Sequence, residues 1–225
     1  MFVLKDLPPS LDAALLAKLQ RCETATIGHF MLAGFMDARI QPIQTGTRIA
    51  GTAVTVRTHG TDSTIISHAL SQARPGDVLI IDRSGEARHA SWGLVTSTAA
   101  KVAGLAGVII DGRACDLGDI RAVGLPLWCI GPSPILTRPL AMAGDFNIPV
   151  NCGGVVVNPG DAILADDSGV LVLAPHEIAA VADHALELQE REVGILERVR
   201  AGTKLSEISG ATKAILAAMA KQPKA

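Results

Sequence analysis

The sequence predicts a single α/β domain, and three patterns among its 225 residues support this prediction. Two short, nearly all-apolar runs, VLIID at 78–82 and GVIID at 107–111, are typical of strands buried on both faces of a parallel sheet. Between them, residues 94–104 have helical apolar spacing and end at Gly104. Strand, helix and strand in this order predict a parallel crossover unit.

The segments before this unit alternate in the same way. Residues 11–22 predict a helix with Ser10 as its N-cap, and residues 49–57 predict a strand rich in β-branched side chains. Residues 62–73 predict a second helix, capped by the Asp-Ser pair at its start and followed by a Pro-Gly-Asp turn.

A short strand is predicted at 126–130, and residues 148–174 predict strands separated by tight turns. The sequence PGDAILADDSG at 159–169 partly repeats PGDVLIIDRSG at 75–85. Reuse of one turn–strand–turn pattern is the simpler explanation of this repeat. The repeat also suggests two similarly built sheets that pack together.

The last part of the chain predicts helices. Residues 176–202 form a long amphipathic pattern that ends at Gly202, and residues 205–220 predict a short helix. No linker rich in Pro, Gly or Ser divides the chain. The prediction is therefore one domain over 1–225, with a core at about 45–175 and C-terminal helices at 176–220.

The composition excludes several classes of protein. The net charge is -2, basic residues form no run, aromatic residues make up 3% and Tyr is absent, so a nucleic-acid binder is not expected. The four cysteines form no CxxC pair, which argues against a structural zinc site or a disulfide framework. The first residues lack a secretory pattern and no apolar run reaches about 18 residues, so we expect a cytoplasmic protein without a membrane span.

One stretch concentrates acidic side chains, since Asp111, Asp116 and Asp119 lie where the strand at 107–111 ends and a glycine-containing loop begins. Ligands of parallel α/β sheets bind beyond the carboxyl ends of the strands. Carboxylate oxygens suit a hard cation such as Mg²⁺, which keeps several waters. The alternative is that these aspartates cap turns and the start of the next segment.

A second candidate is the start of the helix that follows Trp92. The backbone amides of Gly93, Leu94, Val95 and Thr96 could hold an anion, because the first amides of a helix lack partners within it. Every helix has such an end, so a cap or water is the alternative occupant. The histidines have no metal-ligand spacing, and GxSxG, HExxH and Walker motifs do not occur.

Several of these motifs together resemble the RraA-like family. They are Trp92-Gly93, AAK at 99–101, GLAGVIIDG at 104–112, Asp116, GTAVTVR at 51–57, Asp62, PGDVLIID at 75–82 and IPVNCGGVVVNPGDAILADDSGV at 148–170. That family includes 4-hydroxy-4-methyl-2-oxoglutarate and 4-carboxy-4-hydroxy-2-oxoadipate aldolases and proteins named as regulators of ribonuclease E activity. The resemblance covers roughly residues 50–200.

The resemblance implies a β/β/α swivelling-domain-type fold that assembles as a homotrimer or hexamer. It also implies a divalent metal, Mg²⁺ or Mn²⁺, held by Asp116, with Asp119 as the second acid of the motif. The keto acid carboxylate would lie on the amides at 93–96. An acidic residue crossing from a neighbouring subunit is placed in the helix that contains Glu190 and Glu192, with Glu192 as the candidate.

This sequence departs from the aldolase pattern at two positions. Cys115 stands where the family has the arginine that stabilises the enolate, and Leu94 stands where it has an acid. A thiol carries no permanent positive charge and cannot make an arginine's bidentate contact. Arg113, two residues earlier, would face the same side on an extended segment and could replace part of that charge.

The predicted function is a metal-dependent lyase acting on a small 2-keto acid, by retro-aldol cleavage or by decarboxylation of oxaloacetate. Arg113 and Cys115 are the candidate catalytic residues, and Cys115 also belongs to the candidate substrate-binding set. The alternatives are a protein-binding regulator, for example of a ribonuclease, with a vestigial pocket, and an enzyme of the same fold with a different substrate.

Overall fold

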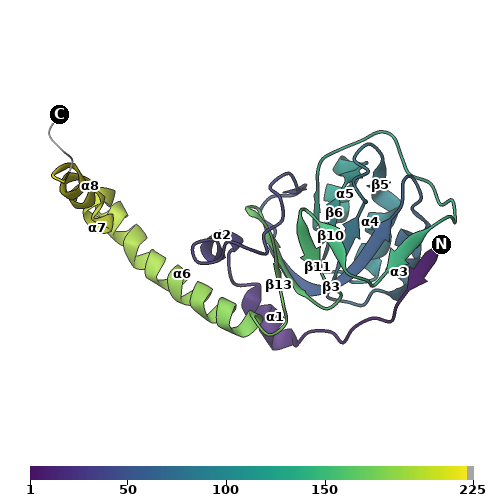
Figure 1. Cartoon of the computed structure of the whole chain (residues 1–225), viewed down its shortest axis with the longest axis horizontal. Helices are drawn as coiled ribbons and strands as arrows, with labels where there is room; N and C mark the ends of the chain where they lie inside the picture. Colours follow the sequence, from purple (N-terminus) through teal and green to yellow (C-terminus); the bar gives the residue numbers. More distant parts are fainter. Residues whose placement is uncertain (222–225) are drawn as a thin grey trace.

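The structure, a computed structural model, describes residues 1–221 and is centred on one mixed sheet (Figure 1). Its middle consists of four parallel strands, β3 (Ile49–Thr58), β4 (Asp77–Asp82), β6 (Gly107–Asp111) and β8 (Leu127–Cys129). Helix α4 (Leu94–Val102) lies between β4 and β6 in the chain, as the crossover pattern predicts. The prediction of an α/β fold with a parallel crossover is therefore confirmed.

The edges of the sheet are mostly antiparallel. Strand β2 (Gln41–Pro42) pairs with β8 at one edge. At the other edge the long strand β3 takes two antiparallel partners, β12 (Ala162–Asp166) along its first half and β9 (Gly144–Phe146) along its second. Strand β13 (Gly169–Leu173) pairs with β12, and β1 (Phe2–Leu4) runs parallel to β9.

The internal repeat does not generate two packed sheets, because β4 and β12 both pair with β3 in one sheet. Its aspartates instead build the same turns twice. Asp77 accepts the amide of Arg74 at 2.8 Å, and Asp161 accepts that of Asn158 at 2.8 Å. At the far end of each strand, an aspartate accepts the amide two residues later. Reuse of a turn–strand–turn pattern explains the repeat.

Helices and a hairpin cover opposite faces of the sheet. Helices α3 (Thr64–Gln72), α4 and α5 (Leu117–Val123) pack on one face against alternate apolar strand residues such as Leu79 and Ile81. The hairpin of β10 (Val150–Cys152) and β11 (Val155–Val157) covers the other face, where Val78 and Ile80 point. A two-stranded parallel ribbon, β5 (Ala90–Trp92) with β7 (Arg113–Ala114), lies beyond the carboxyl ends of β4 and β6.

A third cluster of apolar side chains joins the first two helices and the start of the last long helix to β12 and β13. It contains residues of α1 (Ala13–Leu19), α2 (Thr24–Ile27) and the first part of α6 (Ile178–Arg200). Asp12, not the predicted Ser10, caps α1, because its carboxylate accepts the amides of Ala14 and Leu15 at 2.9 and 3.0 Å. Ser10 lies too early to reach these first free amides.

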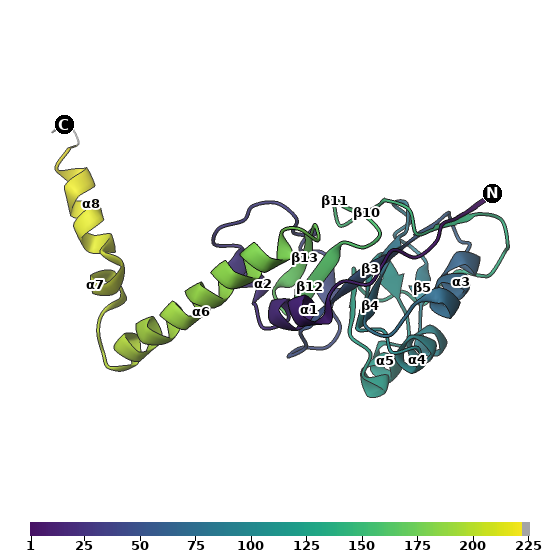
Figure 2. The same cartoon turned by 90° about the horizontal axis from the view of Figure 1, so that it is seen from below.

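The sheet and the elements packed on it form a body, and helix α6 extends away from this body (Figures 1 and 2). Its buried residues, Ile178, Ala182 and Ala185, lie in the first part of the helix. The predicted helix at 205–220 is divided into α7 (Leu205–Ser209) and α8 (Ala211–Met219), because Gly210 adopts a left-handed φ of 70°. None of the described helices combines the length and apolarity needed to span a membrane.

Candidate functional site

A pocket of about 240 Å³ lies where α4 begins, beside β5 and the β7–α5 junction. Its lining joins three segments that are distant in the sequence: residues 90–96, the pair Cys115–Asp116, and the pair Leu136–Thr137, with Ser63 at the side. The two regions predicted from the sequence, the start of α4 and the acidic junction after β6, therefore meet in one cavity.

Asp116 is the carboxylate of this pocket. It is the N-cap of α5 in a left-handed conformation, with φ 54° and ψ 35°, and its side chain is exposed rather than folded back onto α5. Its Oδ2 accepts the amide of Leu94 at 3.1 Å. Aspartate tolerates left-handed backbone better than most residues. The turn thus directs a carboxylate to the first amide of another helix.

Cys115 lies against the same carboxylate. Its Sγ is 3.3 Å from Asp116 Oδ2 and 3.3 Å from the carbonyl oxygen of Trp92, and its amide donates to that carbonyl at 2.8 Å. Burial, followed by the hydrogen bond and negative charge of Asp116, raises the pKa of the Cys115 thiol to about 11. At neutral pH this side chain is therefore a protonated thiol that can donate a hydrogen bond, not a thiolate nucleophile.

The start of α4 offers free amides. Gly93 donates to Thr96 Oγ1 at 3.0 Å, and the first helical bond runs from the Ser97 amide to the Gly93 carbonyl oxygen. Leu94 is paired with Asp116, whereas no acceptor in the described chain pairs with the amides of Val95 and Thr96. Two donors at a helix N-terminus thus remain for an anion, next to a fixed carboxylate.

The structure does not bring three other predicted residues to this pocket. Both carboxylate oxygens of Asp111 accept from Arg39 Nη2, at 2.8 and 2.9 Å, and its Oδ2 also accepts the amide of Gly153, on the face covered by β10. Asp119 lies exposed on the first turn of α5 and does not line the pocket. Glu192 is exposed and belongs to α6, a helix that extends away from α4 and α5 (Figures 1 and 2).

Arg113 is also turned away, which corrects its expected role as the replacement cation. Its Nε donates to the Ala87 carbonyl oxygen at 2.6 Å and its Nη1 to that of Pro132 at 3.2 Å, and it lines the neighbouring cavity. Strand alternation fails here because β7 is two residues long and the chain turns sharply at Asp116. The pocket lining described by the structure contains no lysine or arginine.

Sequence reasoning missed the part that Asp62 plays in shaping the pocket. Its buried carboxylate accepts the amides of Leu140, Met142 and Ala143 at 2.7–3.2 Å and the amide of Thr64 at 2.9 Å. Burial would raise the pKa of Asp62, but hydrogen bonds lower it well below its usual value, first that from the Thr64 hydroxyl at 2.6 Å and then those from the backbone amides. Asp62 thus ties the loop that contains the pocket-lining residues 136 and 137 to α3.

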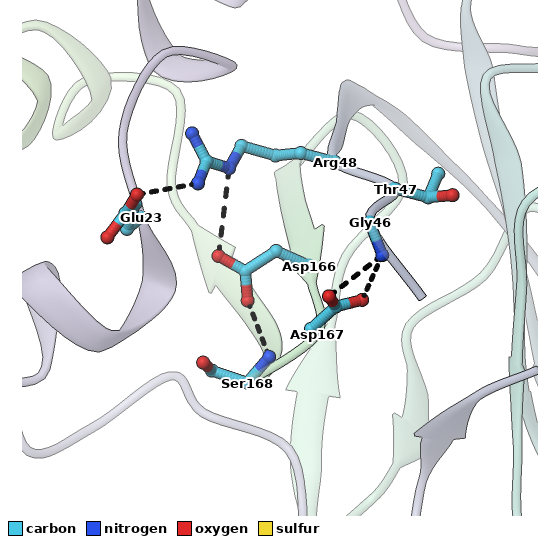
Figure 3. Close-up of a pocket in the computed structure, with 7 residues that line it drawn as sticks. All are labelled: Glu23, Gly46, Thr47, Arg48, Asp166, Asp167 and Ser168. Carbon is cyan, nitrogen blue, oxygen red and sulfur yellow. Dashed lines mark hydrogen bonds and ion pairs between the residues drawn. The ribbon is translucent and has the colours of Figure 1, made fainter. Parts of the chain in front are cut away.

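A larger polar pocket, of about 470 Å³, lies elsewhere, between the N-terminal segment and the β12–β13 turn (Figure 3). Most of its charged groups are paired with one another or with backbone amides. Arg48 bonds Glu23 at 2.9 Å and lies 3.8 Å from Asp166, while Asp167 accepts the Gly46 amide. Asp166 also accepts the amides of Thr24 and Ser168. This arrangement serves to hold the segment before β3 against the β12–β13 turn.

Residues 22–172 match a family model described as RraA-like, aldolase/RraA. Over 138 residues the chain is 33% identical to a protein of Halalkalibacterium halodurans whose name assigns it provisionally as a 4-hydroxy-4-methyl-2-oxoglutarate aldolase. That match spans 61% of this chain and 65% of the relative's length.

Two solved structures are similar to the chain. Streptomyces coelicolor RraAS2, described as an unusual member of the RNase ES inhibitor RraA protein family, has a TM-score of 0.75 at 26% identity, over 84% of this chain and 99% of that chain. The RNA-processing inhibitor RraA from Thermus thermophilis has a TM-score of 0.58 at 28% identity, over 62% and 84%. The predicted fold is therefore confirmed, including its long C-terminal helix.

Proposed function

Because the chain belongs to the RraA-like aldolase/RraA family, we propose that it is a divalent-metal-dependent lyase acting on a small 2-keto acid. The observation that carries this proposal is the meeting of Asp116 with the free amides of Val95 and Thr96 in one small pocket. A 2-keto acid needs a place for its carboxylate beside a positive centre that polarises its carbonyl group. In this pocket the free amides would hold the substrate carboxylate, and the carboxylate of Asp116 would hold the metal ion that polarises the carbonyl group.

The residues present fit a magnesium ion that keeps most of its water. No group of three or more His, Cys, Asp or Glu side chains in the described chain could enclose a metal. Mg²⁺ is usually held by one or two carboxylates together with waters and substrate oxygens. Asp116 would supply the carboxylate, since its Oδ1 has no hydrogen-bond partner among the described residues, and Asp119, one helical turn along, would orient a water.

Retro-aldol cleavage and decarboxylation of oxaloacetate both leave the enolate of pyruvate, whose negative charge must be stabilised. When bound, the metal would polarise the keto oxygen as a Lewis acid. The amides at the start of α4 would orient the carboxylate, and the protonated thiol of Cys115 would donate a hydrogen bond towards the developing charge. Because this thiol replaces an arginine, we expect slow cleavage of 4-hydroxy-4-methyl-2-oxoglutarate.

This proposal is tested by restoring the two family residues. We expect Cys115→Arg combined with Leu94→Glu to raise magnesium-dependent pyruvate release at least about tenfold, a conservative part of what one charged donor supplies. Cys115 lines the pocket and Leu94 is 37% exposed, so the new side chains can be directed towards the pocket and the solvent. Pyruvate release is followed with a coupled assay, with and without a chelator, and Cys115→Ser is the matched control.

The melting temperature of the double variant must also be measured, because an arginine forced into the core would destabilise the fold. The aldol proposal is contradicted if the double variant melts like the parent and binds magnesium, but releases pyruvate no faster than the parent does. Oxaloacetate is then the substrate to test.

The position of Gly93 gives a second prediction. A Cβ at this residue would lie 2.7 Å from both Asp116 Oδ2 and Cys115 Sγ, so Gly93→Ala must displace the carboxylate. We expect magnesium affinity, measured by calorimetry, to fall at least about tenfold, as when groups that orient a ligand are lost. Gly118→Ala on α5 is the control, because its Cβ would meet nothing within 4 Å. Equal magnesium affinity in Gly93→Ala and the parent would argue against Asp116 as the ligand.

A protein-binding regulator is the second candidate function. It is favoured by the absence of a lysine or arginine from the described pocket lining, and by the likeness to structures named as inhibitors of RNA processing. A chain that lacks metal-dependent lyase activity with every keto acid tested, yet binds and inhibits a ribonuclease, would support this alternative.

We also propose that the chain assembles as a homotrimer or hexamer. The outer part of α6, residues 190–200, and the helices after it expose large apolar side chains that pack against no core cluster of the described chain. They are Val193, Ile195, Leu196, Val199, Leu205, Ile215, Leu216 and Met219. Such exposed apolar patches mark interfaces. Assembly could also bring Glu192 of a second copy to the pocket.

Light scattering should therefore give a mass of three or six chains of 23.3 kDa. Leu196→Glu, at a position that is 42% exposed, should lower this mass without lowering the stability of the body. A parent protein that stays monomeric at micromolar concentration contradicts the assembly.

A further inference from the structure

Three large apolar side chains line the candidate pocket and are exposed to solvent. They belong to Leu94, Val95 and Leu136, which are 37%, 82% and 54% exposed, and together they form the apolar rim of the pocket. Exposed apolar side chains that gather at one place on a protein mark a binding site. The apolar rim is therefore the part of the pocket that an apolar group would cover.

The backbone holds each residue of the apolar rim in place. Leu94 and Val95 are the first two residues of α4. Leu136 lies beside β5, because the backbone of Ala90 bonds the residues before and after Leu136, at 2.7 and 3.0 Å. A binding surface that is already ordered loses little conformational entropy when a ligand covers it.

The charges of the pocket do not suit a second carboxylate on the substrate. Of the residues that the structure describes, only Asp116 gives the lining a charged side chain, and that charge is negative. The hydroxyl proton of Thr96 is used within the first turn of α4, where Thr96 Oγ1 donates to the Gly93 carbonyl oxygen at 3.0 Å. A carboxylate placed on the apolar rim would lose water without gaining a cation, which is unfavourable.

We infer that the apolar rim recognises an apolar group at C4 of the substrate, so that the substrate is a 4-hydroxy-2-keto monoacid rather than a diacid. The inference rests on the proposed function, in which the amides of Val95 and Thr96 hold the one carboxylate and leave the rim to the far end of the molecule. A pocket of about 240 Å³ is smaller than those that hold drug-sized ligands, so the far end of a bound keto acid contacts the rest of the lining.

The reaction then yields pyruvate and an apolar ketone or aldehyde. The C4 hydroxyl loses its proton, the bond between C3 and C4 breaks, and its electron pair forms the enolate of pyruvate, which takes up a proton at C3. If C4 carries two methyl groups, the second product is acetone. If C4 carries a methyl group and a carboxylate, the second product is another pyruvate.

Two substrates that differ at a single group test the inference. 4-Hydroxy-4-methyl-2-oxopentanoate carries a methyl group where 4-hydroxy-4-methyl-2-oxoglutarate carries its distal carboxylate, and cleavage of either compound releases pyruvate. With magnesium present, we expect kcat/KM of the parent to be at least about tenfold higher for the methyl compound, because one apolar group in an apolar site is worth about this factor. Val95→Thr and Leu136→Asn keep the size of the side chain and make it polar. The double variant should cleave the two compounds with about equal kcat/KM.

Val102→Thr and Leu140→Asn are the matched controls for these two substitutions. Val102 is 84% exposed on the same helix as Val95, Leu140 is 44% exposed, and neither residue lines the pocket. Both controls should keep the parent's ratio of kcat/KM values and its melting temperature, because exposed substitutions away from a site change stability little.

Binding of acids that cannot be cleaved separates this inference from the proposed function. 2-Oxopentanoate and 2-oxoglutarate lack the C4 hydroxyl, and calorimetry with magnesium should show tighter binding of 2-oxopentanoate by the parent but not by the double variant. If the acids bind in this way and neither hydroxy acid releases pyruvate, the lyase function fails and the apolar recognition stands.

If the parent cleaves the diacid as fast as the methyl compound or faster, the lyase function stands and the inference is overturned. A double variant that keeps the parent's ratio of kcat/KM values also overturns it. A lower mass of that variant in light scattering would then assign the apolar rim to a contact between copies of the chain.

Discussion

Replacement of Asp116 by asparagine should abolish magnesium binding and lower keto acid cleavage by at least about 10³-fold. Asparagine adopts the left-handed conformation that Asp116 has, and its Oδ1 can still accept the amide of Leu94. The fold should therefore remain, while the negative charge that would hold the cation is lost. Calorimetric titration with Mg²⁺ and Mn²⁺, together with pyruvate release, measures both effects.

The matched control is Asp12→Asn, which makes the same change at the N-cap of α1, outside the pocket lining. It should leave metal affinity and cleavage at the parent values, and both variants should melt close to the parent. If Asp116→Asn binds metal as tightly as the parent does, Asp116 is not a metal ligand.

Loss of the Glu86 carboxylate should cause the largest change in stability. Burial would raise the pKa of Glu86, but its hydrogen bonds, first that from His89, then those from the Arg88 amide and Arg83, lower it from 4.5 to about 2. At about 1.36 kcal/mol for each pKa unit this corresponds to about 3 kcal/mol of unfolding free energy. Glu86→Gln also leaves Arg83 as an unpaired buried charge, which typically costs about 3–5 kcal/mol.

The pH dependence has a definite sign. Because the pKa of Glu86 is lower in the folded protein, its contribution is complete above about pH 4.5 and is lost as the pH falls towards 2. At pH 7, Glu86→Gln should lower the melting temperature by about 6–12 °C for a chain of this size. The difference between variant and parent should shrink below pH 4.5.

Glu207→Gln, on the exposed helix α7, serves as the control and should change the unfolding free energy by less than about 0.5 kcal/mol. If the urea midpoints of Glu86→Gln and the parent coincide at pH 7, the pair of Arg83 and Glu86 does not stabilise the fold as described.

The sequence was sufficient for features that depend on local pattern. The strands at 78–82 and 107–111 were predictable because apolar runs of that length are buried on both faces, and the structure pairs them in parallel. The start of α4 was predictable as part of a candidate site because the first amides of a helix lack partners within it, and Asp116 because it follows closely after a strand end. Their meeting in one pocket depends on the β5–β7 ribbon, which no local pattern indicates.

Other features depend on contacts distant in the sequence. Asp111 looked equivalent to Asp116, yet Arg39, 72 residues away, binds it on the opposite face of the sheet. Helix α5 was not predicted, because its seven residues are few and include Gly118. The direction of Arg113 is decided by two carbonyl oxygens from separate loops, so alternation along the strand could not give it.

The outer part of α6 has a consequence for spectroscopy. The chain has two tryptophans and no tyrosine, and both Trp92 and Trp128 are buried in the body, 2% and 0% exposed. Tryptophan fluorescence therefore follows the body alone, whereas far-ultraviolet circular dichroism also follows the 23 residues of α6. In a monomeric chain, the circular dichroism signal should begin to fall at a lower urea concentration than the one at which tryptophan fluorescence changes. The reason is that the exposed part of the helix unfolds first. In an assembly that covers this helix, the two transitions should coincide and move together with protein concentration.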